Sequence, residues 1–223
     1  MSENWLTGWT EQKIEIAQKL SKGESGGTYA EAAIILCSVL SAIAADIWPG
    51  KSKDKKRFVE LLIKYSDESL GAKVISIPLL IGSLRDSEYK EESEILSDLF
   101  MPECDSRVIT GPDVDKDESE IASICPSIPI KLLRQNCYAH ILYTEVRSSY
   151  VHQYLPGKRS DSWAMAPQRR RVEISYVNRL DRVDRQIYYN INWLVSAIRS
   201  IVATTGDDIE SLVKPEFKNW WLL

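Results

Sequence analysis

The stretch Tyr29–Trp48 is apolar on every side of a helix, which limits the folds open to this chain. Its apolar residues form no single stripe: Ala32, Ala33, Ile34, Ile35, Leu36, Val39, Leu40, Ile43 and Ile47. A helix with no polar stripe is normally buried among other elements. Its longest apolar run, Ala32–Ile47, is shorter than the roughly 20 residues that cross a bilayer. We therefore expect no membrane span and a helical bundle with this helix at its centre.

Apolar residues at three- and four-residue spacing predict further helices along the chain. The predicted ranges are Thr10–Leu20, a helix from Asp54 through Tyr65, Glu88–Phe100, about Pro129–Tyr154, and Arg182–Ala203. Residues 169–178 alternate apolar and polar side chains and fit a short strand or a helix about equally well. The sequence predicts an all-α, antiparallel helical bundle with at most one short β element, built as a single domain over residues 1–223.

The charges of the chain are unevenly distributed around a net charge of −4. Residues 86–120 hold 13 acids and 3 bases, with Pro102–Asp117 expected as an exposed loop, whereas residues 147–185 hold 9 bases and 4 acids. We interpret the first segment as an acidic insertion and residues 207–223 as a Trp-rich tail. Two solvated surfaces are the simplest interpretation, but an exposed basic flank also attracts phosphate over about one Debye length.

Cysteine and histidine are too few and too scattered for a structural metal site. The four cysteines contain no CxxC pair, and the chain has two histidines. No Gly-rich phosphate loop, GxSxG or HExxH motif is present. The N-terminal residues lack the basic and apolar regions of a signal peptide. We therefore expect no metal, no cofactor and a cytoplasmic protein with reduced thiols.

One segment near the end of the predicted helix Pro129–Tyr154 concentrates side chains that suit catalysis. It carries Glu145, Arg147, Ser148, Tyr150, His152 and Tyr154. In an α-helix, Glu145 and His152 share nearly one face, and Arg147 and Tyr154 share another with Tyr150 between them. Arg147 and His152 are five residues apart, about 140° around the axis. One helix cannot easily point both at a single atom, so a functional pair requires a symmetric dimer or a local distortion.

An arginine and a histidine suit the cleavage of RNA. The 2′-hydroxyl of RNA can attack its own neighbouring phosphate, so neither an external nucleophile nor a metal is needed. Histidine titrates near neutral pH and can accept or donate the proton. Arginine is always charged, and its planar fork matches the oxygens of a phosphate.

The residues Arg147-Ser148-Ser149-Tyr150-Val151-His152 resemble the R-x4-6-H motif of HEPN-domain proteins. With Gln153-Tyr154 they also resemble the longer R-x4-H-x-Y form of HepT-type toxins. That motif lies near the end of a long helix in an all-helical bundle. Weaker similarity extends to the helices at Tyr29–Trp48, Arg57–Leu62 and Arg185–Ala203.

The resemblance implies a metal-independent endoribonuclease of a prokaryotic defence or toxin–antitoxin system. It implies a homodimer in which two motifs line one cleft, with Arg147 stabilising the phosphate and His152 transferring a proton. Tyr154 matches the position that a partner nucleotidyltransferase modifies with AMP in HepT-type toxins, so an antitoxin or nucleotidyltransferase partner is also implied. Glu145, Ser148 and Tyr150 would line the site.

Two other interpretations remain open. Ser148 stands where the family often has Asn, Asp or His, which favours a HEPN-like module that has lost catalysis and serves in assembly or regulation. Alternatively, Arg169, Arg170, Arg171 and Arg179 could hold RNA in a binder without turnover, although a solvated run is the simpler explanation. Individually, Arg147 could pair with an acid and His152 could cap the helix end. For Trp220 and Trp221, filling a groove of the core is more common than stacking on bases.

Overall fold

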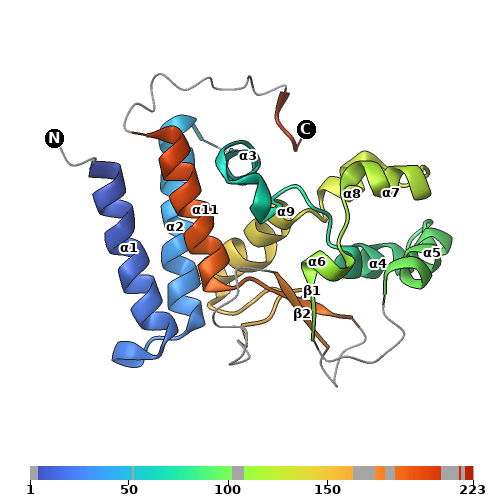
Figure 1. Ribbon diagram of the computed structural model, residues 1–223, viewed down its shortest axis with the longest axis horizontal. Helices are drawn as coiled ribbons and strands as arrows, with labels where there is room; N and C mark the ends of the chain where they lie inside the picture. The colour runs from blue at the N-terminus through green and yellow to red at the C-terminus, as the bar shows by residue number, and fades with distance from the viewer. Residues whose placement is uncertain are drawn as a thin grey trace.

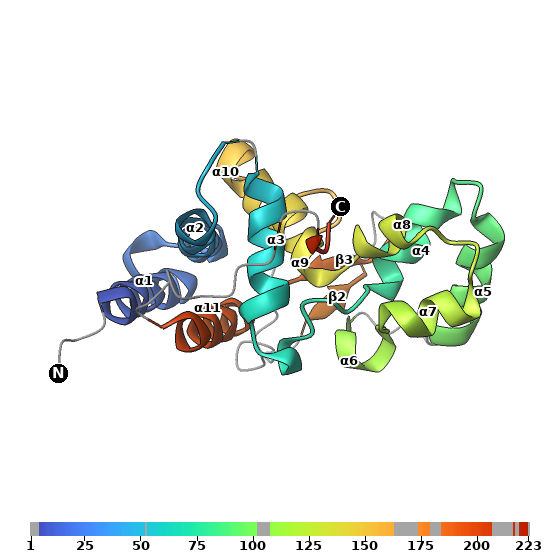
Figure 2. The ribbon, with the colours of Figure 1, turned by 90° about the horizontal axis from the view of Figure 1, so that it is seen from above.

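The computed structural model describes residues 5–51, 53–101, 108–162, 174–178, 184–206, 216 and 219–222. These residues form a mostly helical protein with one small antiparallel sheet, as the sequence predicts (Figure 1). The helices α1 (Trp5–Ser21), α2 (Tyr29–Ile47) and α11 (Ile191–Thr205) lie side by side at one end, and α3 (Asp54–Tyr65) packs against α2 and α11 (Figures 1 and 2).

Helix α2 is the central helix, as its composition predicts. It begins with a capping box in which Thr28 caps the first turn and the carboxylate of Glu31 accepts the backbone N–H of Thr28 at 2.7 Å. It contacts α1, α3 and α11, and most of its residues are buried. By length and composition it could also cross a membrane, but a buried core helix passes the same test. Its packing on several sides within the described residues explains its apolar character.

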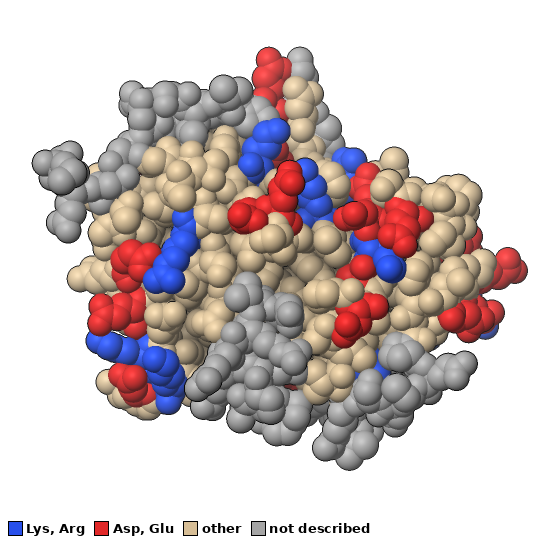
Figure 3. Space-filling model, in the orientation of Figure 1, with Lys and Arg blue, Asp and Glu red and all other residues tan. Residues whose placement is uncertain are grey.

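The opposite end of the molecule holds short helices. They are α4 (Ile77–Arg85), α5 (Lys90–Phe100), α6 (Gly111–Val114), α7 (Glu118–Ile124) and α8 (Ile130–Arg134). Of two 3-10 turns among the described residues, η1 (Glu24–Gly26) follows α1, and η2 (Glu68–Leu70) lies against α11. Acidic side chains gather over the end that carries α5 and α7 (Figure 3). The predicted loop Pro102–Asp117 is only partly right, since its described part contains β1 (Val108–Thr110) and α6.

The sheet has the order β1-β2-β3, with β2 (Ser175–Val177) paired to both neighbours. Tyr176 lies opposite Ile109 on β1 and Ile187 on β3 (Gln186–Tyr188). The strand interpretation of residues 169–178 is therefore confirmed for Ser175–Val177. The predicted helix Arg182–Ala203 is wrong at its start: α11 begins at Ile191, where Asn190 caps it, because residues 186–188 pair with β2.

The predicted helix Pro129–Tyr154 is interrupted once. Residues 135–137 leave the helix after α8, and Cys137 has extended backbone angles. The backbone there pairs with residues 72–76: Ser76 N–H donates to Asn136 O, and Tyr138 N–H donates to Val74 O. The chain then continues as one helix through α9 (Tyr138–Ile141), the π-helical segment η3 (Leu142–Ser148) and α10 (Ser149–Gln153).

Candidate functional site

The motif lies on a helix that is widened in its middle. Through η3 the helix takes π geometry, in which each hydrogen-bonded turn contains one more residue than in an α-helix. Two hydroxyls bond to backbone carbonyls at this place: Thr144 Oγ1 donates to His140 O at 3.1 Å, and Ser149 Oγ donates to Thr144 O at 3.2 Å. Such side-chain bonds loosen the regular helical pattern. The helix is therefore distorted over Leu142–Ser148, the segment that contains Arg147.

The chain after the helix folds back onto the widened turn. The Glu145 carbonyl accepts Gly157 N–H at 2.8 Å and Ser160 Oγ at 3.0 Å. The Glu145 carboxylate pairs with Arg159, with Oε1 at 2.9 Å from Nε. A Cβ on Gly157 would lie 2.8 Å from the Cα of Glu145, so only glycine fits this approach. Glu145 thus anchors the returning chain, and the structure gives it no contact with His152.

Arg147, Tyr150 and Tyr154 form one stripe along α2, as their spacing predicts. Arg147 Nε lies 3.4 Å from Ser41 Oγ, and its guanidinium carbon lies 5.1 Å from the centroid of the Tyr143 ring. The ring of Tyr150 is buried 6.1 Å from that of Tyr29. The hydroxyl of Tyr154 donates to Glu31 at the start of α2. The arginine is therefore positioned by stacking and by one weak hydrogen bond, and its Nη groups have no acceptor among the described residues.

His152 lies on another side of the helix. Its imidazole is exposed and makes no hydrogen bond or ion pair with a described residue. Val151, which precedes it on the helix, and Leu155, just beyond the helix end, are also exposed, at 45% and 63%. Ser148, between the arginine and the histidine, is half-buried. Within one chain Arg147 packs on α2 while His152 faces solvent, so a single subunit does not bring the pair together.

The burial of Tyr150 limits what it can do. Burial raises the pKa of its hydroxyl to about 12, and the nearby carboxylate of Asp161 adds to the effect. The phenol stays neutral at physiological pH, so it cannot serve as the proton acceptor. Burial likewise raises the pKa of the Cys37 thiol beside Arg147 to about 12, so this thiol also stays neutral. Tyr150 acts here as a packing residue that holds the end of the helix on α2.

The predicted basic residues Arg169, Arg170, Arg171 and Arg179 lie outside the described residues. Trp220 and Trp221 are described. Trp220 is 3% exposed and packs edge-on against Trp48, with ring centroids 5.1 Å apart, and Trp221 lies under the guanidinium of Arg134 at 4.2 Å. Both tryptophans therefore pack against the protein. Within the described ranges, no group of three or more His, Cys, Asp or Glu side chains could hold a metal ion.

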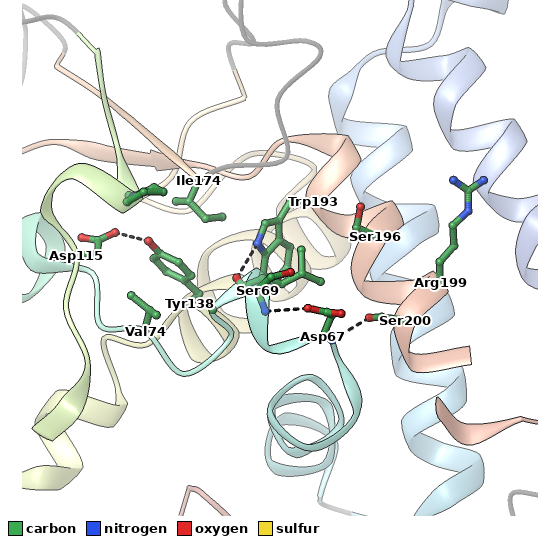
Figure 4. Close-up of a pocket in the computed structure, with 14 residues that line it drawn as sticks. Asp67, Ser69, Val74, Asp115, Tyr138, Ile174, Trp193, Ser196, Arg199 and Ser200 are labelled. Carbon is green, nitrogen blue, oxygen red and sulfur yellow. Dashed lines mark hydrogen bonds between the residues drawn. The ribbon is translucent and has the colours of Figure 1, made fainter. Parts of the chain in front are cut away.

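A separate cavity of about 680 Å³ lies between α11 and α6 (Figure 4). Its walls include Leu70, Val74, Ile174 and Trp193, and one end is formed by Asp115 and Tyr138. The hydroxyl of Tyr138 donates to Oδ2 of Asp115, and the hydroxyl of Tyr176 lies 2.5 Å from the same atom. The backbone N–H of Ile77 donates to Oδ1 of Asp115 at 2.9 Å. Nothing in the sequence distinguishes Asp115 from its acidic neighbours, because its partners come from three distant segments.

We expect Asp115 to make the folding stability depend on pH. Burial raises the pKa of this carboxyl to about 7, so between about pH 4 and 7 the folded state holds a proton that the unfolded state has released. The free energy of unfolding therefore falls as pH rises through this window, by at most about 4 kcal/mol. In Asp115→Asn this contribution is absent, so the variant gains stability relative to the wild type between pH 5 and pH 8.

Urea unfolding of both proteins at several pH values measures the difference. The matched change at an exposed carboxylate, Asp46→Asn, is the control. A stability difference between Asp115→Asn and the wild type that stays constant from pH 5 to pH 8 would contradict the prediction.

Comparisons of the chain with protein-family models, with curated proteins and with solved structures find no match in any of the three.

Proposed function

We propose that this protein is a metal-independent endoribonuclease of the HEPN type that acts as a homodimer in a prokaryotic defence or toxin–antitoxin system. The observation that carries the proposal is the state of the two motif side chains. Arg147 is positioned by Tyr143 and Ser41 with its Nη groups available, and His152 is exposed without a partner among the described residues. A structural arginine would have acceptors for its Nη groups and a capping histidine would have a partner for its ring, and neither is found among the described residues.

The proposed reaction is an internal transesterification of RNA. The 2′-oxygen forms a bond to the adjacent phosphorus, and the bond from phosphorus to the 5′-oxygen of the next nucleotide breaks. His152 accepts the proton of the 2′-hydroxyl, and the imidazolium that this forms donates the proton to the departing 5′-oxygen. The Nη groups of Arg147 bind the oxygens of the phosphate, where negative charge gathers in the transition state. The products are a 2′,3′-cyclic phosphate and a free 5′-hydroxyl.

The dimer follows from the divergence of the two side chains. A phosphate held by Arg147 of one subunit requires a histidine from elsewhere, and a second copy related by a twofold axis supplies one. The exposed pair Val151 and Leu155 beside His152 gives such a dimer an apolar contact. The resemblance also implies a silencing antitoxin or nucleotidyltransferase that acts on Tyr154, whose side chain is 55% exposed. The unpaired thiols of Cys37, Cys125 and Cys137 suit the cytoplasm of the host.

The test is cleavage of a fluorescent oligoribonucleotide in EDTA, with the products identified by mass spectrometry. We expect cleavage that leaves 2′,3′-cyclic phosphate ends, and none in a matched oligonucleotide whose nucleotide at the cut position carries a 2′-deoxyribose. Cleavage that needs added metal, or that proceeds at the deoxyribose, would contradict the mechanism. A stable dimer that leaves every tested RNA intact would favour the assembly module instead.

A further inference from the structure

A small basic pocket lies beside the motif helix, between the first turn of α3 and α8. It has a volume of about 340 Å³, and the residues that matter for its chemistry are Lys55, Lys56, Lys131, Arg134, His140 and Trp221. None of the described residues that line it is acidic. Four cations around one concave surface, with no carboxylate among those lining residues, favour an anionic ligand.

The floor of the pocket is held in place by contacts that are already satisfied. Arg134 makes a two-pronged pair with Glu118, at 2.7 and 3.2 Å, and its guanidinium lies over the ring of Trp221. The backbone N–H of Trp221 donates to the carboxylate of Glu60 at 2.8 Å, and the backbone carbonyl of Trp221 accepts from the Arg134 guanidinium at 3.1 Å. Because Glu118 neutralises Arg134, the charge offered to a ligand comes from the lysines. Lys55 and Lys131 form no ion pair with a described residue.

His140 forms the inner wall of the pocket and leaves one ring nitrogen for a ligand. The side chain is 6% exposed, and Nδ1 donates to Gln135 O at 2.8 Å. No described residue bonds to Nε2. Burial, together with the charges of Lys55 and Arg159, lowers the pKa of this imidazole to about 4, and the Gln135 carbonyl and Glu145 partly oppose this shift. The ring is therefore neutral in the free protein, and a bound anion would favour its protonation.

The pocket and Arg147 lie along the same stretch of the helix. His140, Tyr143 and Arg147 are spaced three and four residues apart, and the ring of Tyr143 packs on Phe58 of α3 with centroids 5.3 Å apart. The first turn of α3, with Asp54, Lys55 and Arg57, borders both the pocket and Tyr143. The charges of Asp54 and Arg57 shift the pKa of Tyr143, and the charge of Lys55 lowers the pKa of His140. Arg57 is paired with Asp54 and adds little net charge. The first turn of α3 therefore lies next to both the pocket and the Tyr143 ring on which Arg147 stacks.

We propose that this basic pocket binds a backbone phosphate of the RNA next to the scissile one, through Lys55, Lys131 and the Nε2 of His140. The inference rests on the proposed function for the identity of the strand. It assigns the pocket a role in substrate affinity, separate from the chemistry at Arg147 and His152. It also explains why a neutral histidine is buried among cations: the bound phosphate supplies the charge that makes protonated His140 favourable.

The chain has two histidines, so NMR of their ring signals reports the pocket and the motif separately. The probes are a 2′-O-methyl oligoribonucleotide, which cannot be cleaved by 2′-hydroxyl attack, 5′-AMP and inorganic phosphate. We expect the oligonucleotide to raise the pKa of His140 by about 1 to 3. The double variant Lys55→Ala/Lys131→Ala should abolish this rise, and the control Lys22→Ala/Lys90→Ala, at exposed lysines outside the pocket, should retain it.

Binding measured by fluorescence anisotropy gives the second readout. The slope of log affinity against log salt should fall by about 1 for each pocket lysine removed. An unmoved His140 signal, or an equal response in the double variant, would overturn the inference. Tighter binding of 5′-AMP or phosphate than of the oligonucleotide would also overturn it, in favour of a free nucleotide. The NMR and binding measurements do not depend on cleavage. If the protein cleaves no RNA but shows the expected His140 response, the proposed function is refuted and the pocket remains assigned.

Discussion

Replacing Arg147 or His152 by alanine is expected to lower the rate of RNA cleavage by about 10²–10⁴-fold while the protein remains folded. A positioned proton-transfer group contributes typically about 10²–10⁴-fold, and a positioned charge at the developing anion contributes a similar amount. Arg147 makes one weak hydrogen bond and one stacking contact, and His152 is exposed and makes no hydrogen bond or ion pair with a described residue, so neither change removes much folding energy. The measurement is single-turnover cleavage, with circular dichroism and thermal melting to verify the fold.

Mixing the two inactive variants tests whether the site is shared between subunits. If Arg147 of one subunit acts with the histidine of the other, a mixed dimer of Arg147→Ala and His152→Ala contains one intact pair. Random co-refolding makes half of the dimers mixed, and each mixed dimer has one of its two sites intact, so activity should recover to about a quarter of the wild-type value. Gln153→Ala, an exposed change on the same turn, is the matched control and should cleave normally. Full activity in both single variants, or the same loss in the control, would contradict the assignment.

Replacing Gly157 by alanine is expected to lower the free energy of unfolding by about 2–3 kcal/mol, in the upper part of the usual range for overpacking a tight contact. The new Cβ would lie 2.2 Å from Glu145 Oε2 and 2.8 Å from the Cα of Glu145. The carboxylate can rotate away, but the backbone atom cannot move without shifting the π-helical segment. The hydrogen bond from Gly157 N–H to Glu145 O and the pair between Glu145 and Arg159 should weaken together.

Thermal melting should show the Gly157→Ala change as a fall of about 5–10 °C in Tm. Gly8→Ala is the matched control, because a Cβ there meets no atom within 4 Å and the position lies inside α1, where alanine is the better helix former. The control should melt at or above the wild-type temperature. A Gly157→Ala protein as stable as the wild type would show that the close approach to Glu145 does not hold the returning chain in place.

The local pattern of the sequence predicted the parts of the structure that depend on neighbouring residues. The sequence predicted the ends of helix α2 to within one residue, since Thr28 and Pro49 mark them. Its burial was also predictable, because a helix with apolar side chains on every side has no polar face to present to solvent. The stripe of Arg147, Tyr150 and Tyr154 was also predictable, since three- and four-residue spacing places side chains on one face.

The interruption at residues 135–137 could not be predicted in the same way. Those residues carry no proline or glycine, and they leave the helix because the backbone of residues 72–76 offers hydrogen bonds there. The strand β3 was missed for a similar reason: residues 186–188 continue the apolar spacing of the next helix, but pairing with β2 decides their conformation.

The sequence by itself determined that the chain forms a helical protein around α2 and that an arginine and a histidine stand near the end of one helix. Only the tertiary structure decided where those side chains face, which helical turn is widened, and that Lys55, Lys131 and His140 share a pocket. The physical reason is the range of the interactions. Periodicity and capping act within a few residues, whereas the π-helical turn, the fold-back at Gly157 and the basic pocket depend on contacts between segments distant in the chain.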